Sequence, residues 1–191
     1  LDKDGKKFAS RKGKTVFMKD VLDETIKLAE KSVKGRKVSS NVALEIARAA
    51  IFYGDLKNQP SRDAIFDIDK FLQFSGDTGP YLLYTYARSN SIVSGLKVEK
   101  FSSNELDICE MELIKKMGEF SNVVESSMEN INPSLVSHYS YELCQKFNEF
   151  YHACKVVGSP NEKFRIALVK SFMIVLKNSL ALLGINVVGE M

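Results

Sequence analysis

The chain has 191 residues, of which 45% are hydrophobic and 27% are charged, and its formal net charge is +3. This length allows one compact core, or one domain with an extension, and the small net charge excludes a uniformly basic chain. The charge is nevertheless uneven, because residues 1–37 carry 12 Lys and Arg against 6 Asp and Glu. The basic segment is either a solvated tail or a surface for an anionic partner.

Hydrophobic periodicity predicts six helices and no strand. The expected helices run over about residues 18–35, 40–53, 80–94, 104–129, 133–157 and 160–184. Residues 1–16, rich in Gly and Lys, are expected to form a loop, and "IFDIDKFL" a short turn or 3₁₀ segment. The pattern predicts an all-α fold, an antiparallel helical bundle preceded by a basic loop.

Local signals set the expected helix ends. Gly35 and Gly54 are expected to end the first two helices. Pro133 fits the first position of the fifth helix after an Asn132 cap, and residues 159–162 form a capping-box pattern before the last helix. The residues expected on inward faces are Met18, Leu22, Ile26, Ala29, Val33, Val42, Ile46, Ala49, Ala50, Leu106, Cys109, Leu113, Met117, Phe120, Val124, Met128, Val136, Tyr139, Leu143, Phe147, Phe150, Cys154, Val157, Phe172 and Leu176.

The cysteines favour a reducing compartment, and the hydropathy of the chain argues against a membrane segment. The three cysteines form no C-x-x-C pair and no even disulfide framework. No signal-peptide pattern is present, and the polar start without an initiating Met indicates a fragment of a longer protein. The most apolar stretch, "FMIVLKNSLALL", is interrupted by Lys177 and Asn178 and is too short to span a bilayer. We therefore expect a cytoplasmic protein without a membrane segment.

No residue pattern in 38–191 indicates catalysis. His138 and His152 are expected to be surface or partly buried residues, because neither belongs to a recognisable triad or metal-ligand spacing. The two aspartates of Asp67–Asp69 could hold a cation, but short Asp-rich turns usually cap their own backbone. No phosphate-binding glycine loop of the Walker or G-x-G-x-x-G type is present. We expect no metal site, and binding is the better interpretation.

Residues 75–88, "SGDTGPYLLYTYAR", combine turn residues with three tyrosines and an arginine. Pro80 fits the first position of a helix, on which Tyr81, Tyr84 and Arg88 share one stripe and Tyr86 points elsewhere. Such a stripe is usually part of a core, but a charged group rarely ends a fully buried stripe. If they are exposed, the same residues could stack on unpaired bases and form hydrogen bonds with them. Composition leaves both interpretations open.

Taken together, several segments in order resemble the C-terminal part of the arginyl-tRNA synthetase family. "GKKFASRKGKTV" looks like the family's version of the second class I synthetase motif, Lys-Met-Ser-Lys-Ser, and is followed by the helix "DVLDET". Residues 50–88 are similar to the stretch leading into the anticodon-binding domain. "ALLGINVVGEM" resembles the usual C-terminus and favours the arginine type over the related cysteine and methionine types.

The resemblance implies a split into two parts. Residues 1–35 would be the end of a catalytic domain with its ATP-closing loop and connecting helix, and residues 36–191 a helical anticodon-binding domain. The family joins arginine to its tRNA through an arginyl-adenylate, using ATP and Mg²⁺. Lys7 and Arg11 are expected to act on the ATP phosphates, and Ser10 and Lys12 to bind the nucleotide. Ala9 stands where serine is usual and Ser10 where lysine is usual, so that Arg11 and Lys12 would replace the missing lysine.

For the helical domain, the resemblance implies that Tyr81, Tyr84 and Arg88 meet the anticodon loop of the tRNA. Tyr151 and Met191 match the other side of the same pocket. Tyr86 has no counterpart and is assigned to packing. The chain is expected to be monomeric. Because it lacks a His-Ile-Gly-His-like motif and a parallel sheet, it is expected to be inactive alone, although the parent protein would be an arginine–tRNA ligase.

Two alternatives remain from the residues themselves. One is a helical RNA-binding or regulatory module that never had catalysis, and the other is a protein-interaction bundle whose exposed aromatics meet a partner helix. The basic loop argues against both, because neither module has a use for a nucleotide-closing motif.

Overall fold

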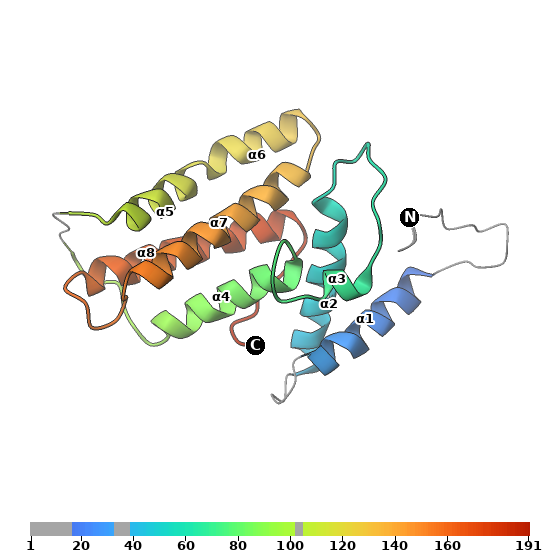
Figure 1. Ribbon diagram of the computed structural model, residues 1–191, viewed down its shortest axis with the longest axis horizontal. Coiled ribbons are helices and arrows are strands. Elements are labelled where there is room, and N and C mark those ends of the chain that lie inside the picture. The colour runs from blue at the N-terminus through green and yellow to red at the C-terminus, as the bar shows by residue number, and fades with distance from the viewer. Residues whose placement is uncertain (1–16, 33–38, 102–104) are drawn as a thin grey trace.

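The computed structural model describes residues 17–32, 39–101 and 105–191, and these contain eight helices and no strand (Figure 1). The helices are α1 Met18–Ser32, α2 Ser40–Leu56, α3 Ile68–Phe71, α4 Gly79–Val93, α5 Ile108–Gly118, α6 Phe120–Glu129, α7 Ser134–Ala153 and α8 Glu162–Leu182. The all-α prediction is confirmed for this part of the chain.

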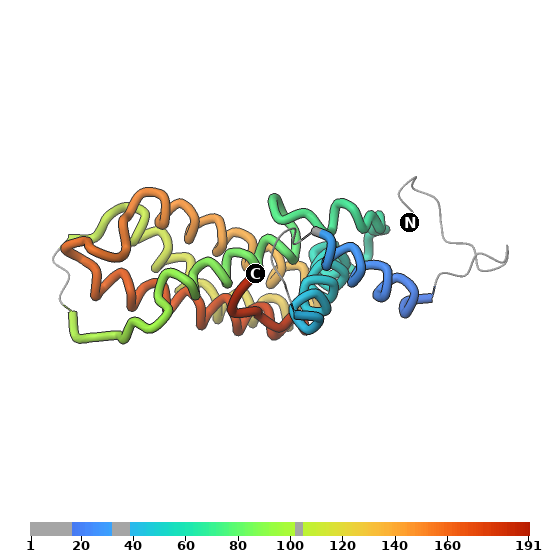
Figure 2. The backbone as a smooth tube through the Cα atoms, turned by 90° about the horizontal axis from the view of Figure 1, so that it is seen from below, coloured from blue at the N-terminus to red at the C-terminus, as the bar shows by residue number. Residues whose placement is uncertain are grey.

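Helices α4, α7 and α8, together with the α5–α6 pair, form an elongated bundle in which successive members run in opposite directions (Figure 1). Helix α7 lies between α5 and α6 on one side and α4 and α8 on the other. Helix α2 crosses the end of the bundle and α1 packs on α2, so the pair forms one end of the molecule (Figure 2). This arrangement leaves both flanks of α4 next to a long helix, α7 on one and α8 on the other.

The core lies along α7 and α8, as the periodicity of these helices predicts. Leu143, Phe147, Phe172 and Leu176 have no exposed surface. The rings of Phe147 and Phe172 stack with centroids 4.1 Å apart and an interplanar angle of 11°. Stacked aromatic rings add a specific attraction to the large area that each buries. The contact between α7 and α8 is therefore the centre of the hydrophobic core.

The prediction of one helix over residues 104–129 is wrong, because α5 ends at Gly118 and α6 begins at Phe120. The Tyr139 hydroxyl on α7 donates to the carbonyl oxygen of Lys116 at 3.0 Å. In a continuous helix this carbonyl would instead accept from a backbone amide of the same helix. The amide of Glu119 also bonds this oxygen, at 3.3 Å, in a tighter turn. A contact from another helix thus supports a break that the apolar pattern does not show.

Several expected helix ends also differ. Helix α2 continues past Gly54 to Leu56, and a Cβ at position 54 would lie 2.6 Å from the ring of Phe71. Gly54 therefore admits the close packing of α3 on α2 rather than ending the helix. Gly35 lies outside the described residues. Helix α4 begins at Gly79 after a Thr78 cap, so Pro80 lies in the first turn but at the second helical position, one residue later than expected.

The last two helices each begin later than the sequence predicts. Helix α7 begins at Ser134, after Pro133, and the Asn132 side chain accepts from the Ser134 amide at 3.2 Å. Helix α8 begins at Glu162, and the capping-box prediction for residues 159–162 is wrong. The Ser159 hydroxyl donates instead to the carbonyl of Val156 at 3.1 Å. The inward-face prediction fails for four exposed residues, Met18, Leu106, Met128 and Val157, while Val33 lies outside the described residues.

The segment after α8 folds back onto α2 and α4. Ile185 and Val188 are buried, with 1% and 7% of their surfaces exposed. The Asn186 side-chain amide donates to Glu45 on α2 at 3.3 Å, and the Asn90 side chain on α4 donates to the carbonyl of Gly189 at 2.9 Å. Residues 185–191, called the tail from here on, therefore lie along the same helix that carries the predicted base-reading stripe.

Candidate nucleic-acid interface

A close approach between α4 and α2 fixes the position of α4. The Thr78 hydroxyl accepts from the amide of Tyr81 at 3.4 Å and so caps the start of the helix. Gly79 follows, and a Cβ at this position would collide with the carbonyl oxygen of Ala49. Only glycine allows the two backbones to approach this closely. The direction of α4, and with it the orientation of the tyrosines that follow, depends on this contact.

The predicted stripe on α4 divides into a packed residue and an exposed one. Tyr81 is partly buried, its hydroxyl accepts from the Asn148 side chain of α7 at 2.8 Å, and its ring centroid lies 5.7 Å from that of Tyr141. Burial raises the pKa of the Tyr81 phenol. Tyr84, one turn further on, has 43% of its surface exposed. Tyr81 therefore lies behind the surface that Tyr84 presents.

Arg88 and Tyr151 come together between α4 and α7. The Arg88 guanidinium carbon lies 4.4 Å from the centroid of the Tyr151 ring, which is a cation–π contact. Tyr151 in turn is parallel to Phe147, with centroids 6.3 Å apart and planes 14° apart. With Phe172 below Phe147, these groups form a column from the surface into the core. We call Tyr84, Arg88 and Tyr151 the aromatic edge.

Met191 belongs to the tail and is partly buried against the core. The bond between Asn90 and Gly189 places the preceding residues of the tail on α4. Tyr86 is also partly buried against the core, so its assignment to packing is confirmed. Asn148, which holds Tyr81, was not predicted. It precedes Tyr151 by three positions on α7, and this helical spacing could have indicated it.

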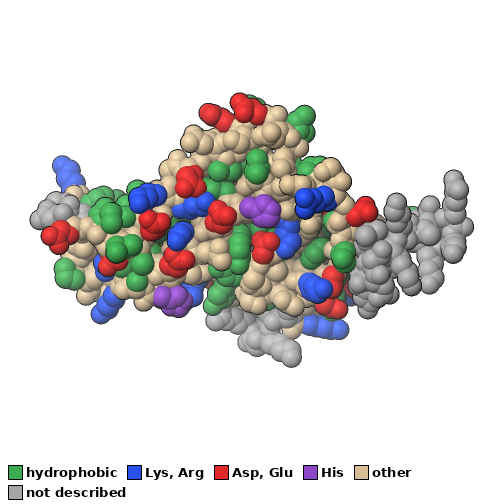
Figure 3. Space-filling model, turned by 45° about the horizontal axis from the view of Figure 1, so that its top comes forward, with side chains coloured by type: hydrophobic (Ala, Val, Ile, Leu, Met, Phe, Trp, Pro, Cys, Tyr) green, Lys and Arg blue, Asp and Glu red, His purple; other side chains and the backbone are tan. Residues whose placement is uncertain are grey.

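The face turned toward the reader in Figure 3 carries acidic and basic side chains in close alternation. Among the ion pairs of the described residues, the Lys116 ammonium lies 2.8 Å from Glu119 and 2.6 Å from Glu142. Such a mixed surface has no extended positive field for a polyanion. The aromatic edge is therefore a stronger candidate for an interface with nucleic acid than this mixed-charge face.

The remaining candidate groups show no catalytic arrangement within the described residues. His138 and His152 are both exposed, as expected. The Asp67 side chain accepts from the Lys70 amide at 3.2 Å, so it caps its own short helix, and this bond lowers the pKa of the carboxyl. No group of three or more His, Cys, Asp or Glu residues that could hold a metal occurs in the part of the chain that the structure describes. Lys7, Ser10, Arg11 and Lys12 lie outside the described residues.

The family to which this bundle belongs follows from comparison with known proteins. Residues 82–191 match the family model of the DALR anticodon binding domain, and residues 1–68 match that of the class I (R) tRNA synthetase catalytic domain. The fold is thus that of a helical domain of a class I aminoacyl-tRNA synthetase. The chain belongs to the DALR anticodon-binding domain family, in the form found in the C-terminal part of arginyl-tRNA synthetase.

The curated relatives of this chain are named as arginine–tRNA ligases. The chain is 33% identical to an arginine–tRNA ligase of Bacillus cereus over 196 residues, which is 99% of this chain and 35% of that protein. It is 35% identical over 199 residues to the arginine–tRNA ligase of Clostridium botulinum, covering 97% of this chain and 35% of the relative. The chain therefore spans about a third of the length of the curated relatives it matches.

Solved structures agree with this assignment. The arginyl-tRNA synthetase of Thermus thermophilus superposes with a TM-score of 0.87 at 26% identity, covering 100% of this chain and 34% of that one. The enzyme from Plasmodium falciparum gives a TM-score of 0.84 at 29% identity, covering 92% of this chain and 34% of its own. No helix in the described residues is long and apolar enough to cross a membrane.

Proposed function

We propose that the chain is the tRNA-binding end of an arginine–tRNA ligase and that its aromatic edge holds the anticodon loop. The observation that carries this proposal is the exposed Tyr84 beside an Arg88 guanidinium that lies 4.4 Å over the Tyr151 ring. Aromatic faces stack on unpaired bases irrespective of their identity, and a guanidinium adds directed hydrogen bonds to a base or phosphate. Tyr81 supports this edge from behind, and Met191 supplies adaptable apolar cover.

The test of the edge is binding of an RNA hairpin with the anticodon stem and loop of an arginine tRNA. Tyr84→Ala is expected to weaken binding by about 1–3 kcal/mol, the usual value of one stacked base, and Met191→Ala to weaken it as well. Phe52→Ala is the matched control, because Phe52 on α2 is also an exposed ring, 40% accessible, with an arginine 5.8 Å from its centroid. Equal binding by the Tyr84 and Phe52 variants would remove the aromatic edge from the interface.

Folding must be measured alongside binding. Because Tyr84 is exposed, its substitution is expected to leave the urea midpoint of unfolding unchanged. A large loss of stability would show that Tyr84 belongs to the core, which is the competing interpretation of the stripe.

We propose further that residues 1–35 are the end of the catalytic domain and residues 36–191 the anticodon-binding domain. Lys7, Ser10, Arg11 and Lys12 would then form the loop that meets ATP and Mg²⁺ when the complete catalytic domain is present. Positive groups stabilise the charge that builds up at the phosphates during adenylate formation, where water is excluded. Mg²⁺ in nucleotide sites is usually held by one or two carboxylates together with phosphate oxygens of the nucleotide.

Pyrophosphate exchange dependent on arginine tests this part of the proposal. The chain alone is expected to show none. In the full-length enzyme, Lys7→Ala or Arg11→Ala is expected to slow adenylate formation by about 10²–10³-fold, as for the loss of one charge-stabilising group. Rates within threefold of the parent for both variants would exclude the loop from the mechanism. We also propose that the enzyme is cytoplasmic, which the lack of a disulfide framework in the sequence supports. We propose that it is monomeric.

A further inference from the structure

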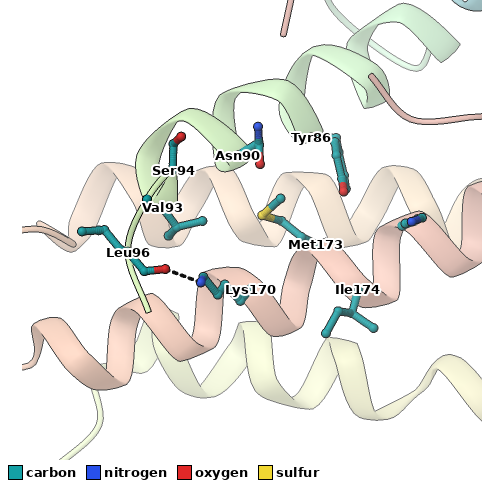
Figure 4. Close-up of a pocket in the computed structure, with 10 residues that line it drawn as sticks. Tyr86, Asn90, Val93, Ser94, Leu96, Lys170, Met173 and Ile174 are labelled. Carbon is teal, nitrogen blue, oxygen red and sulfur yellow. Dashed lines mark hydrogen bonds between the residues drawn. The ribbon is translucent and has the colours of Figure 1, made fainter. Parts of the chain in front are cut away.

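A second binding surface lies on the other flank of α4. Where the last turns of α4 pass α8, an open groove of about 490 Å³ runs between the two helices (Figure 4). Helix α4 contributes Tyr86 and Asn90, and α8 contributes Lys170, Met173 and Lys177. The aromatic edge faces α7, whereas this groove faces α8, so the two surfaces lie on opposite flanks of one helix.

The groove differs from two other pockets of the described residues in its charge. Its lining includes two lysines and no carboxylate. The pocket between α6 and α7 contains Glu119 and Glu142, and the pocket beside the tail contains Glu45 and Glu190. A phosphate entering either of those pockets would be repelled by two carboxylates, and the lining of the groove contains no carboxylate.

The two lysines of the groove have different roles. The Lys170 ammonium donates to the carbonyl oxygen of Leu96, just after α4, and so offsets the negative end of that helix (Figure 4). Lys177 lies seven positions further along α8, hence on nearly the same face, and is exposed. It has no ion-pair partner among the described residues. Lys163, on the same helix, is instead paired with Glu99 at 2.7 Å. Lys177 is thus the free positive charge of the groove.

The groove also adjoins the tail. Asn90 lines the groove, and its side-chain amide donates to Gly189, two residues before Met191. Between the groove and Arg88 lies only the body of α4, and a helix with its side chains is about 10–12 Å across. An RNA loop held at the aromatic edge could therefore reach the groove across the exposed face of α4.

We propose that Lys177, with Tyr86 beside it, binds a backbone phosphate of the tRNA next to the anticodon loop. This inference rests on the proposed function, since it assigns a second contact to the same RNA. Tyr86 lines the groove together with Lys177, and its phenol is a neutral hydroxyl donor. A lysine contact to phosphate positions the RNA and does not read its sequence.

The experiment measures the dissociation constant of the arginine anticodon hairpin over a series of salt concentrations. Lys177→Ala is expected to weaken binding by about 1.5- to fivefold near 0.1 M salt, the usual range of one exposed charge contact. It is also expected to reduce the slope of log K against log salt by about 0.7–0.9, the value for one phosphate. A free phosphate or mononucleotide has no condensed counterion layer, so the change of slope identifies a polymer.

Two controls make the result specific. Lys163→Ala removes the same charge from the same helix outside the groove and is expected to leave the slope unchanged. Lys177→Arg keeps the charge and is expected to retain the slope. Because phosphate contacts are independent of sequence, the effect of Lys177→Ala is expected to be equal for hairpins with altered loop bases, unlike that of Tyr84→Ala.

The outcomes separate this inference from the proposed function. If the unmodified chain does not bind the hairpin, the proposed function fails and the inference with it. If it binds and Lys177→Ala changes neither affinity nor slope, or changes them no more than Lys163→Ala does, the inference alone is overturned. A loss confined to one loop sequence would also overturn it, because it would assign Lys177 to base reading.

Discussion

Glu110 illustrates how much one buried charge depends on its partners. Its side chain has no exposed surface, and one oxygen accepts from Arg165 on α8 at 2.6 Å. The other accepts from the amide of Asp107 at 2.7 Å and so closes the capping box of α5. A carboxylate removed from water is tolerated only when such partners satisfy it. This pair joins α5 to α8 near the end of the bundle.

Arg165→Ala is therefore expected to destabilise the protein by about 3–5 kcal/mol, because it leaves the Glu110 charge buried and unpaired. Urea unfolding followed by far-ultraviolet circular dichroism measures the change. Lys163→Ala, which breaks an exposed pair only two positions away, serves as control and is expected to leave the midpoint unchanged. Adding Glu110→Gln to Arg165→Ala is expected to recover part of the loss. No recovery would contradict the assignment of the cost to the stranded charge.

The cysteines give a second prediction for single residues. Burial raises the pKa of the Cys144 thiol above its ordinary value of 9.0, and burial also raises that of Cys154. At pH 8 a thiol reagent is expected to label the partly exposed Cys109 in the folded protein, and Cys144 only after unfolding. Above about pH 9 the unfolded thiols lose protons that the folded ones keep, so stability is expected to fall as pH rises. Rapid labelling of Cys144 in the folded state would contradict its burial.

Among the elements, α7 and α8 determine whether the bundle forms. Their faces were predictable because every third or fourth residue is apolar over four or more turns. Phe147 and Phe172, which stack at 4.1 Å, lie at the centre of that contact. A core of this kind loses both transfer free energy and packing when a ring is removed.

Phe147→Ala or Phe172→Ala is expected to cost about 3–5 kcal/mol of unfolding free energy. Thermal and urea unfolding of each variant measure this loss. Ile174→Ala is a control on the same helix, since 61% of Ile174 is exposed. An unchanged melting temperature in both phenylalanine variants would mean that the inward faces had been assigned incorrectly.

What the sequence could not predict at this scale depends on contacts between distant residues. The break between α5 and α6 involves the Tyr139 hydroxyl, which is 23 positions away from Lys116. Gly54 is explained by the ring of Phe71 and not by its own helix. The same holds for the candidate site, where a helical stripe indicated Tyr81, Tyr84 and Arg88 but not which of them would turn inward. Asn148 on α7 decides that for Tyr81.

At the scale of the whole molecule, the described helices fall into a bundle and an attached pair. The contacts of α1 are made mainly with α2, where Thr25 and Ala29 are buried. Helix α2 also packs on α4, so it belongs to both parts. The tail, in contrast, packs onto α2 and α4 from the far end of the chain. The bundle with its tail is therefore expected to be the unit that folds.

A chain of residues 36–191 is accordingly expected to unfold in one cooperative transition, with a slightly lower midpoint than the full chain. Removing residues 185–191 instead is expected to cost more, because burial of a large aliphatic side chain such as Ile185 contributes about 1.5–3 kcal/mol. Calorimetry of the two shortened chains measures both effects. A broad, non-cooperative transition for residues 36–191 would place the domain boundary elsewhere.

The column of Arg88, Tyr151, Phe147 and Phe172 has an optical consequence. The sequence contains seven tyrosines and no tryptophan, so the intrinsic emission of the protein comes from tyrosine. Tyr151 has a guanidinium over its ring, 4.4 Å from the centroid. A nucleobase that displaced this group would stack on the ring and quench its emission. Occupancy of the aromatic edge could then be followed without a label, and the Tyr151→Phe variant would identify the source of the signal.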